Sequence, residues 1–211
     1  MGTIHLDQRV ALFTLALFVV FLTGCASSPP SKFYQLNAVQ GKASVTRDSS
    51  PCRSLVIAIG PVRIPDYLDR PQIVTRSGNN ELKLSEFDRW AGSLERDVSR
   101  VLEEDISGLL PADCLSVVRW TPLPWNQVPA SYSVEVLVDR FEGTLGDSLL
   151  LKAQWGVFAH DGGLLLKKES RIREQMNGSS YDALVAAMSS ALERLSRDIA
   201  DGIRSTVAEG K

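Results

Sequence analysis

Residues 85–111 read SEFDRWAGSLERDVSRVLEEDISGLLP, and this stretch carries the clearest periodic pattern in the chain. Ser85 with Asp88 three residues later resembles a capping box, whereas Gly108 and Pro111 are typical of a helix end. Charged residues of both signs separate the apolar ones, as on the solvent-facing side of an amphipathic helix. We therefore predict a long helix that begins near Ser85 and buries one apolar stripe. The stripe comprises Phe87, Trp90, Ala91, Leu94, Val98, Val101, Leu102, Ile106 and Leu109.

A second amphipathic helix is predicted near the C-terminus. Ser179 with Asp182 three residues later repeats the start signal of the first helix. The apolar residues that follow recur at helical spacing and form one stripe. This stripe comprises Leu184, Val185, Met188, Ala191, Leu192, Leu195, Ile199 and Ile203.

Strand-like segments precede and separate the two helices. Residues 131–142 alternate between apolar and polar side chains, which predicts a strand. The sequence Asp161-Gly162-Gly163 predicts a hairpin turn that joins strands at 149–159 and 164–173. Because each helix has one apolar stripe, each must be covered by a sheet. We predict an α+β fold in which a two-layer, mostly antiparallel sheet is packed by two long helices in a single domain over 33–208. Further strands are expected at 33–36, 55–59, 62–65, 72–76, 81–84 and 115–120.

The N-terminus has the layout of a secretory signal. The apolar core at 10–22 is shorter than the roughly 20 residues that span a membrane. It ends in Leu22-Thr23-Gly24-Cys25, which resembles the bacterial lipobox, whose cysteine is acylated and holds the protein to a membrane. We therefore predict a signal peptide over 1–24, lipidation at Cys25 and a tether over 25–32. A soluble secreted protein with a chance cysteine is the alternative.

The residues after the cysteine and the overall charge bear on location and partners. Ala26 and Ser27 follow Cys25 without an Asp at the second position, and by resemblance to known sorting signals this favours the outer membrane. The formal net charge is −2, and no basic cluster is present in the sequence. This balance argues against nucleic acid as a partner and leaves the lipid as the membrane attachment.

Cys52 and Cys114 are the other two cysteines of the mature chain. An oxidising periplasm favours disulfide formation between such a pair. Each cysteine lies just before an apolar strand-like run, so a disulfide would staple neighbouring strands at one end. Two buried free thiols are the alternative, because sequence does not give the distance that closure requires.

Few residues suit catalysis or metal binding. The histidine of the mature chain is His160, next to Asp161 at a predicted turn, whereas zinc sites and catalytic triads need further partners. The acidic triplet at 103–105 consists of helix neighbours that do not share one face. We predict no metal and no cofactor. Three more carboxylates lie at a predicted strand end and its loop: Asp139, Glu142 and Asp147. A glycosidase needs two carboxylates at a defined separation, which sequence spacing does not give.

Residues 59–74, IGPVRIPDYLDRPQIV, combine three prolines with a Tyr-Leu-Asp-Arg turn. An irregular sheet edge is one interpretation of this stretch. Together with FYQL at 33–36 and FDRW at 87–90, in the same order, it resembles the ABC-type transport auxiliary lipoprotein family. The resemblance runs from Phe33 to the final helix. The pair of Cys52 and Cys114 departs from what we can assign to that family as a whole.

The resemblance implies an outer-membrane lipoprotein that faces the periplasm and assists lipid transport between the two membranes, which would maintain outer-membrane integrity. It implies no catalysis, and its expected partners are a periplasm-spanning MCE-domain protein and an inner-membrane permease; a homo-oligomer stays open. A lipid carrier with an apolar cavity and an envelope hydrolase are the alternatives. We predict docking of the MCE-domain protein at an aromatic, arginine-bearing turn. Its residues are Tyr67, Leu68, Asp69, Arg70, Pro71 and Gln72.

Overall fold

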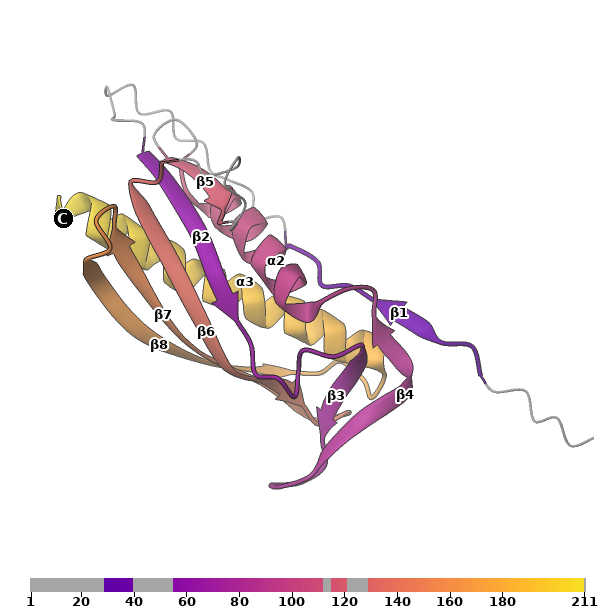
Figure 1. Ribbon diagram of the computed structural model, residues 1–211. Helices are drawn as coiled ribbons and strands as arrows, with labels where there is room; N and C mark the ends of the chain where they lie inside the picture. Colours follow the sequence, from indigo (N-terminus) through magenta and orange to yellow (C-terminus); the bar gives the residue numbers. More distant parts are fainter. Residues whose placement is uncertain (1–28, 40–54, 112–114, 121–128, 211) are drawn as a thin grey trace, which may run out of the picture. The chain divides into compact units, whose positions relative to one another are not determined.

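The computed structural model describes residues 29–39, 55–111, 115–120 and 129–210. From Ser31 to Lys211 the chain forms one compact unit. Two helices and two sheets make up its described part (Figure 1). In chain order the elements are β1 (Lys32–Tyr34), β2 (Leu55–Arg63), β3 (Gln72–Arg76), β4 (Leu82–Trp90), α2 (Leu94–Leu109), β5 (Leu115–Arg119), β6 (Tyr132–Gly143), β7 (Ser148–Ala159), β8 (Leu164–Gln175) and α3 (Tyr181–Ala208).

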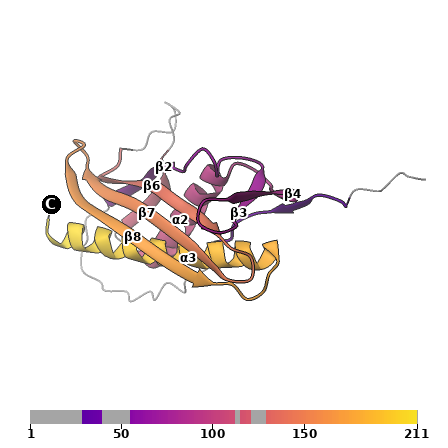
Figure 2. The same cartoon turned by 90° about the horizontal axis from the view of Figure 1, so that it is seen from below.

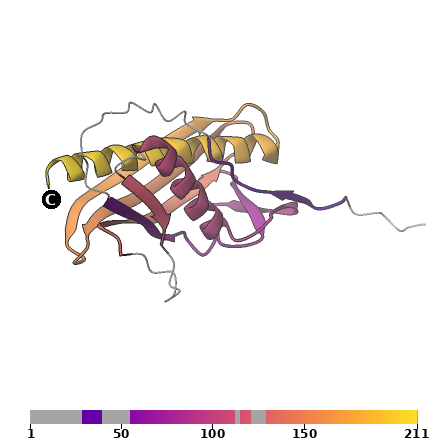
Figure 3. The same cartoon turned by 90° about the horizontal axis from the view of Figure 1, so that it is seen from above.

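A five-stranded sheet in the order β5-β2-β6-β7-β8 forms one layer, and both helices lie on one of its faces. Figure 2 shows the strands in front of the helices, and Figure 3 shows the helices from the opposite side. α2 packs on β2 and β5, α3 packs on β7 and β8, and the two helices contact each other. The predicted α+β class with two amphipathic helices on a sheet is therefore confirmed.

The strand pairing is more mixed than the sequence suggested. β2 runs parallel to both β5 and β6, while β6, β7 and β8 form an antiparallel series. α2 lies between β4 and β5 in the chain, and such a crossover helix allows β5 to return parallel to β2. A second sheet, in the order β1-β4-β3, joins a parallel pair to an antiparallel hairpin.

The first long helix begins later than predicted. Residues at Ser85 and beyond continue β4 as far as Trp90, and α2 begins at Leu94 with Ser93 as its N-cap. Ser85 does hydrogen-bond Asp88, and the Asp88 N–H donates to Ser85 Oγ at 2.9 Å, but this local motif lies within a strand. Strand pairing to β1 and β3 outweighs the local helix signal at this position.

The N-cap of the second helix lies one residue after the predicted one, at Ser180, which accepts a hydrogen bond from the Ala183 N–H at 3.1 Å. The residues of its predicted stripe are buried against the sheet. A glycine allows the helix to approach closely: a Cβ on Gly202 would lie 2.6 Å from Cη2 of Trp155. Trp155 is 2% exposed, so α3 and β7 meet at this point without space for a side chain.

Candidate functional site

The connection between β2 and β3 contains the predicted docking turn. The Leu68 N–H donates to the carbonyl oxygen of Pro65 at 2.9 Å, which closes a backbone turn. Leu68 is 2% exposed and belongs to the core, whereas Asp69, Arg70 and Pro71 are exposed. The turn is therefore anchored by one apolar side chain and presents three consecutive residues to solvent.

The other two residues of the predicted turn have structural contacts. Gln72 begins β3, is partly buried and pairs with Arg89 of β4. The Tyr67 hydroxyl donates to Oε2 of Glu142 at 2.9 Å. Tyr67 therefore faces the large sheet, and its ring is partly buried rather than displayed as a free anchor.

Beneath the turn lies a buried charged cluster made of Tyr67, Arg76, Arg140 and Glu142, which we call the Glu142 cluster. Arg76 donates from Nε and Nη2 to Oε1 of Glu142 at 3.0 and 2.8 Å, and Arg140 donates from Nε at 3.0 Å. The Phe141 N–H donates to the other carboxylate oxygen at 3.1 Å. The cluster thus joins β3, β6 and the docking turn.

The charges of the Glu142 cluster do not cancel. The side chain of Glu142 is 0% exposed, while those of Arg76 and Arg140 are 22% and 37% exposed. Burial, and then the nearby carboxylate of Glu142, raise the pKa of Tyr67, so its hydroxyl remains a donor at neutral pH. Two guanidinium groups face one carboxylate, which leaves one net positive charge beneath the turn. Since both carboxylate oxygens already accept hydrogen bonds, the cluster is suited to holding the turn rather than to proton transfer.

Sequence reasoning missed Glu142 as a site residue. Its partners Tyr67 and Arg76 lie 75 and 66 positions away, so no local spacing connects them. The sequence offered one weak signal, because an acidic side chain near the end of a well-defined strand needs a partner if the strand end is buried.

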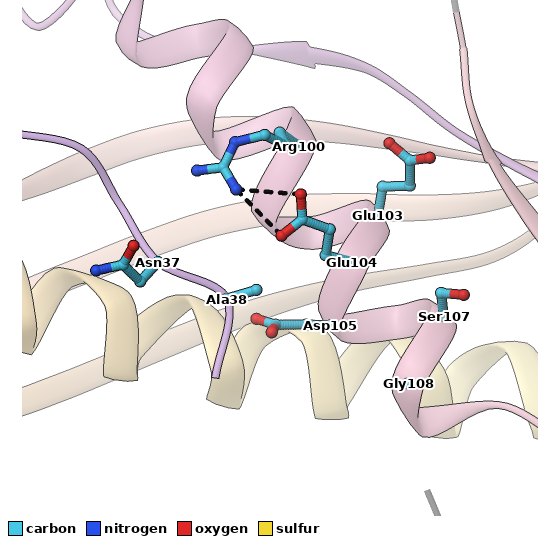
Figure 4. A pocket seen from close by; sticks show the side chains of 8 residues that line it. All are labelled: Asn37, Ala38, Arg100, Glu103, Glu104, Asp105, Ser107 and Gly108. Carbon is cyan, nitrogen blue, oxygen red and sulfur yellow. Dashed lines mark hydrogen bonds and ion pairs between the residues drawn. The ribbon is translucent and has the colours of Figure 1, made fainter. Parts of the chain in front are cut away.

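An open pocket lies along the outer side of α2, with a volume of about 670 Å³. Figure 4 shows that the acidic side chains at 103–105 do not all point the same way, with Glu104 directed toward Arg100. In the residues that the structure describes, no group of three potential ligands is arranged to hold a metal ion. The lining residues are Asn37, Ala38, Arg100, Glu103, Glu104, Asp105, Ser107 and Gly108.

Asp105 is the unusual member of this pocket. It is 4% exposed, and its Oδ1 has no hydrogen-bond partner. The Ser196 hydroxyl of α3 donates to its Oδ2 at 3.4 Å. Burial, with a smaller contribution from the charge of Glu193, raises the pKa of Asp105 to about 6. The α2–α3 contact therefore contains a carboxyl group that titrates close to neutral pH.

β1 and the segment after it, residues 32–39, form what we call the N-terminal strap, and hydrogen bonds fix it to both helices. The Leu36 N–H donates to Oδ2 of Asp97 at 2.7 Å, and Arg100 donates to the Leu36 carbonyl at 2.6 Å. The Asn37 N–H donates to the hydroxyl of Ser189 in α3 at 3.2 Å. Leu36 itself is 0% exposed. The strap is therefore part of the folded unit.

Tyr34 fixes the start of the strap. Its hydroxyl donates to Oδ1 of Asp88 at 2.9 Å. Burial and then this hydrogen bond raise the pKa of Tyr34 to about 12, so the hydroxyl stays protonated near neutral pH. Tyr34 is therefore held to β4 in two ways, by the backbone pairing of β1 with β4 and by this side-chain hydrogen bond.

The three predicted cysteine sites, Cys25, Cys52 and Cys114, lie outside the described residues. The strands beside the last two are adjacent: Leu55 of β2 pairs with Leu115 of β5 in parallel register. His160 is exposed at the turn between β7 and β8.

Asp105 and Glu142 are the buried acids among the described residues, and the hydrogen-bond partners of one are not partners of the other. Each carboxylate is thus part of a separate set of polar contacts. The carboxylate of Glu142 accepts hydrogen bonds from Arg76 and Arg140, and the carboxylate of Asp105 accepts one from Ser196.

Comparison with known proteins places this fold in a family. The profile of the ABC-type transport auxiliary lipoprotein component matches residues 34–200, and the chain belongs to this family. Its relatives include the intermembrane transport lipoprotein PqiC of Escherichia coli K12, which is 25% identical over 194 residues, covering 92% of this chain and 96% of PqiC.

Two solved structures share the fold. A crystal structure of an uncharacterized protein superposes with a TM-score of 0.65 at 20% identity, covering 83% of this chain and 99% of that one. A protein from Xanthomonas campestris gives a TM-score of 0.62 at 18% identity, covering 85% and 98%. In the described residues, neither helix is long and apolar enough to cross a membrane.

Proposed function

We propose that the chain is a lipid-anchored accessory subunit of an MCE/ABC-type intermembrane lipid transport system. In this role it resides at the periplasmic face of the outer membrane and docks the periplasm-spanning MCE-domain protein there. The observation that carries the proposal is the family match over residues 34–200, together with the similarity to PqiC over nearly the whole chain. The lipobox-like Leu22-Thr23-Gly24-Cys25 supplies the anchor.

The docking surface is the exposed part of the turn, Asp69, Arg70 and Pro71. Leu68 and Tyr67 hold this turn from below, through the core and through Glu142. A turn that is fixed before binding loses little conformational freedom when it meets a partner. An exposed arginine on such a support is a typical interface anchor. The structure therefore favours two roles among the predicted residues: Tyr67 and Leu68 hold the turn in place, and Asp69, Arg70 and Pro71 contact the partner.

The packing of the core favours an accessory role over lipid carriage. Side chains that are 0% exposed, such as Ile57, Leu102 and Leu195, occupy the space between the large sheet and the helices. The pocket on α2 is lined largely by polar and charged residues, which do not match an acyl chain. Extraction and mass spectrometry of the purified protein should accordingly yield no stoichiometric lipid held by the domain.

Co-purification from membranes with the anchor intact tests the proposal. The MCE-domain partner should be captured by the wild-type protein and by Arg171→Glu, an exposed arginine of β8 that serves as the matched control. Arg70→Glu should reduce capture because it reverses the charge at the docking turn. Equal capture by Arg70→Glu would remove the turn from the interface, whereas absence of capture by the wild type would contradict the partner assignment.

The anchor has a separate test. A Cys25→Ala protein that is exported should fold normally but fail to restore the phenotype of a deletion strain, because it is no longer held at the membrane. Full restoration by this soluble form would show that lipidation is dispensable for function. Measurement of the protein level in the periplasm distinguishes loss of activity from loss of the protein.

A further inference from the structure

Phe33 is the most exposed of the large apolar side chains in the described residues, with 66% of its surface accessible. It lies on β1, the edge strand of the small sheet, directly opposite Arg89 of β4. Because paired residues of adjacent strands project from the same face, an aromatic and a cationic side chain lie side by side there. Lys32 precedes Phe33 and pairs with Asp88, so it projects from the opposite face and is not part of this arrangement.

Arg89 lacks a partner that would explain its position. It makes no ion pair within the described part of the chain, and its Nε is buried without a hydrogen-bond acceptor. The nearby carboxylate of Asp88 is already engaged by Tyr34 and Ser85. Arg89 is only partly buried as a residue, so its terminal Nη atoms, and not the buried Nε, are the atoms that can meet an anionic group from another molecule.

The short chain between Cys25 and β1 limits the distance between this edge of the small sheet and a lipid attached to Cys25. Six residues separate Cys25 from Lys32, and the seven Cα-to-Cα steps between them span at most about 25 Å when the chain is fully extended. The N-terminal strap is hydrogen-bonded to α2 and α3, so no slack follows Lys32. By contrast, the 28 residues of α3 extend for about 42 Å. If Cys25 is lipidated, as our proposed function requires, the edge at β1 is the part of the domain held beside the bilayer.

We propose that Phe33 and Arg89 form a membrane-contact surface. Phe33 inserts among the lipid headgroups, and Arg89 contacts a lipid phosphate. An interfacial aromatic beside basic residues is the usual composition of such contacts. The surface orients the domain, so that the small sheet faces the bilayer and the C-terminal end of α3 points away from it. This end of α3 lies opposite β1 and β4 in Figure 1.

Tryptophan quenching by brominated lipids tests the contact. The full-length, lipidated protein is reconstituted into vesicles of phosphatidylethanolamine and phosphatidylglycerol with bromine on the acyl chains. Phe33→Trp adds one tryptophan at the proposed contact, and Leu164→Trp adds one at an exposed apolar position on β8, 54% exposed, as the matched control. We expect the added fluorescence at position 33 to fall by about twofold or more, and that at position 164 to be unchanged.

The outcomes separate this inference from the proposed function. Protein that floats with the vesicles but shows no more quenching for Phe33→Trp than for Leu164→Trp overturns the contact surface and leaves the anchor intact. Protein that does not float contradicts both. In the Phe33→Trp background, Arg89→Gln should reduce the quenching, whereas Arg171→Gln should not. Unchanged quenching with Arg89→Gln would exclude the phosphate contact.

Discussion

Tyr67 and Glu142 are 75 positions apart in the sequence, and a 2.9 Å hydrogen bond between them connects the docking turn to the end of β6. Glu142 is fully buried, so this bond operates where water does not compete. The turn consequently depends on a strand of the large sheet for its position.

Substitution of Glu142 by Gln should destabilise the protein strongly. Arg76 and Arg140 would then face each other across a neutral amide, and breaking a buried ion pair costs about 3–5 kcal/mol. Partial exposure of both arginines reduces the expected loss below this range, to about 2–3 kcal/mol. Urea unfolding measures the difference, with Glu135→Gln on the exposed face of β6 as control.

Tyr67→Phe is the milder form of the same test. It removes one hydrogen bond to a charged group and should lower the free energy of unfolding by about 1–2 kcal/mol. If the Glu142 cluster supports docking, this variant should also weaken capture of the MCE-domain partner although Tyr67 is not itself displayed. Unchanged stability in both Tyr67→Phe and Glu142→Gln would show that the cluster contributes little.

Asp105→Asn should stabilise the protein in a pH-dependent manner. The pKa of Asp105 is raised from 3.8 to about 6 in the folded protein, so folding favours the protonated form. The protonated carboxyl group of Asp105 therefore contributes most to the free energy of unfolding below pH 4, and this contribution is lost as the pH rises toward 6. The full shift corresponds to about 3 kcal/mol.

Thermal or urea unfolding at two pH values checks this prediction. At pH 7.5 Asp105→Asn should be more stable than the wild type, and near pH 4 the two should be similar, because the wild-type carboxyl group is then neutral. Asp66→Asn, at an exposed position, serves as control. A wild-type advantage at pH 7.5 would mean that the ionised carboxylate has an additional favourable contact.

Gly202→Ala should destabilise the contact between α3 and β7. A methyl group at this position would overlap the Trp155 ring, with 2.6 Å between the added carbon and Cη2, and overpacking of this kind costs about 1–3 kcal/mol. Ala186→Ser, an exposed change in the same helix, is the control. Trp155→Leu in the Gly202→Ala background should make the cost of the alanine smaller, and strict additivity of the two changes would contradict the proposed overlap.

Cys52 and Cys114 should form a disulfide in the exported protein. Leu55 and Leu115, which closely follow them, are paired on adjacent strands, and strands in a sheet lie about 4.8 Å apart. Such spacing favours the Cα separation of about 5.5–6 Å that disulfides prefer. Alkylation of denatured, unreduced protein should therefore leave both thiols unlabelled, and Cys52→Ser should lower stability by about 2–4 kcal/mol. Labelling of both thiols would favour the free-thiol alternative.

Much of the fold could be predicted because its signals are local. The stripe of α3, from Leu184 to Ile203, and the hairpin through Gly162 both follow from periodicity and turn residues. The start of α2 was predicted wrongly because Ser85 and Asp88 make a real local hydrogen bond inside a strand. Only the pairing of β4 with β1 and β3 decides that region.

The Glu142 cluster shows the opposite situation. Arg76, Arg140 and Glu142 are common surface residue types, and nothing in their spacing indicates a shared site. The choice of Tyr67 came from its residue type beside a proline-rich turn, and the structure assigns it a supporting contact. Long-range polar contacts of this kind depend on topology, which hydrophobic periodicity does not specify.

The N-terminal strap also has a mechanical consequence. Tension applied to the tether would be transmitted along β1, whose parallel pairing with β4 resists sliding through several hydrogen bonds loaded together. Beyond β1, the backbone of Leu36 is hydrogen-bonded at both of its polar groups: its N–H donates to Asp97, and its carbonyl oxygen accepts from Arg100. A domain pulled between the membrane and a partner would therefore bear the load first in shear, where β1 contacts β4 and the backbone of Leu36 contacts α2.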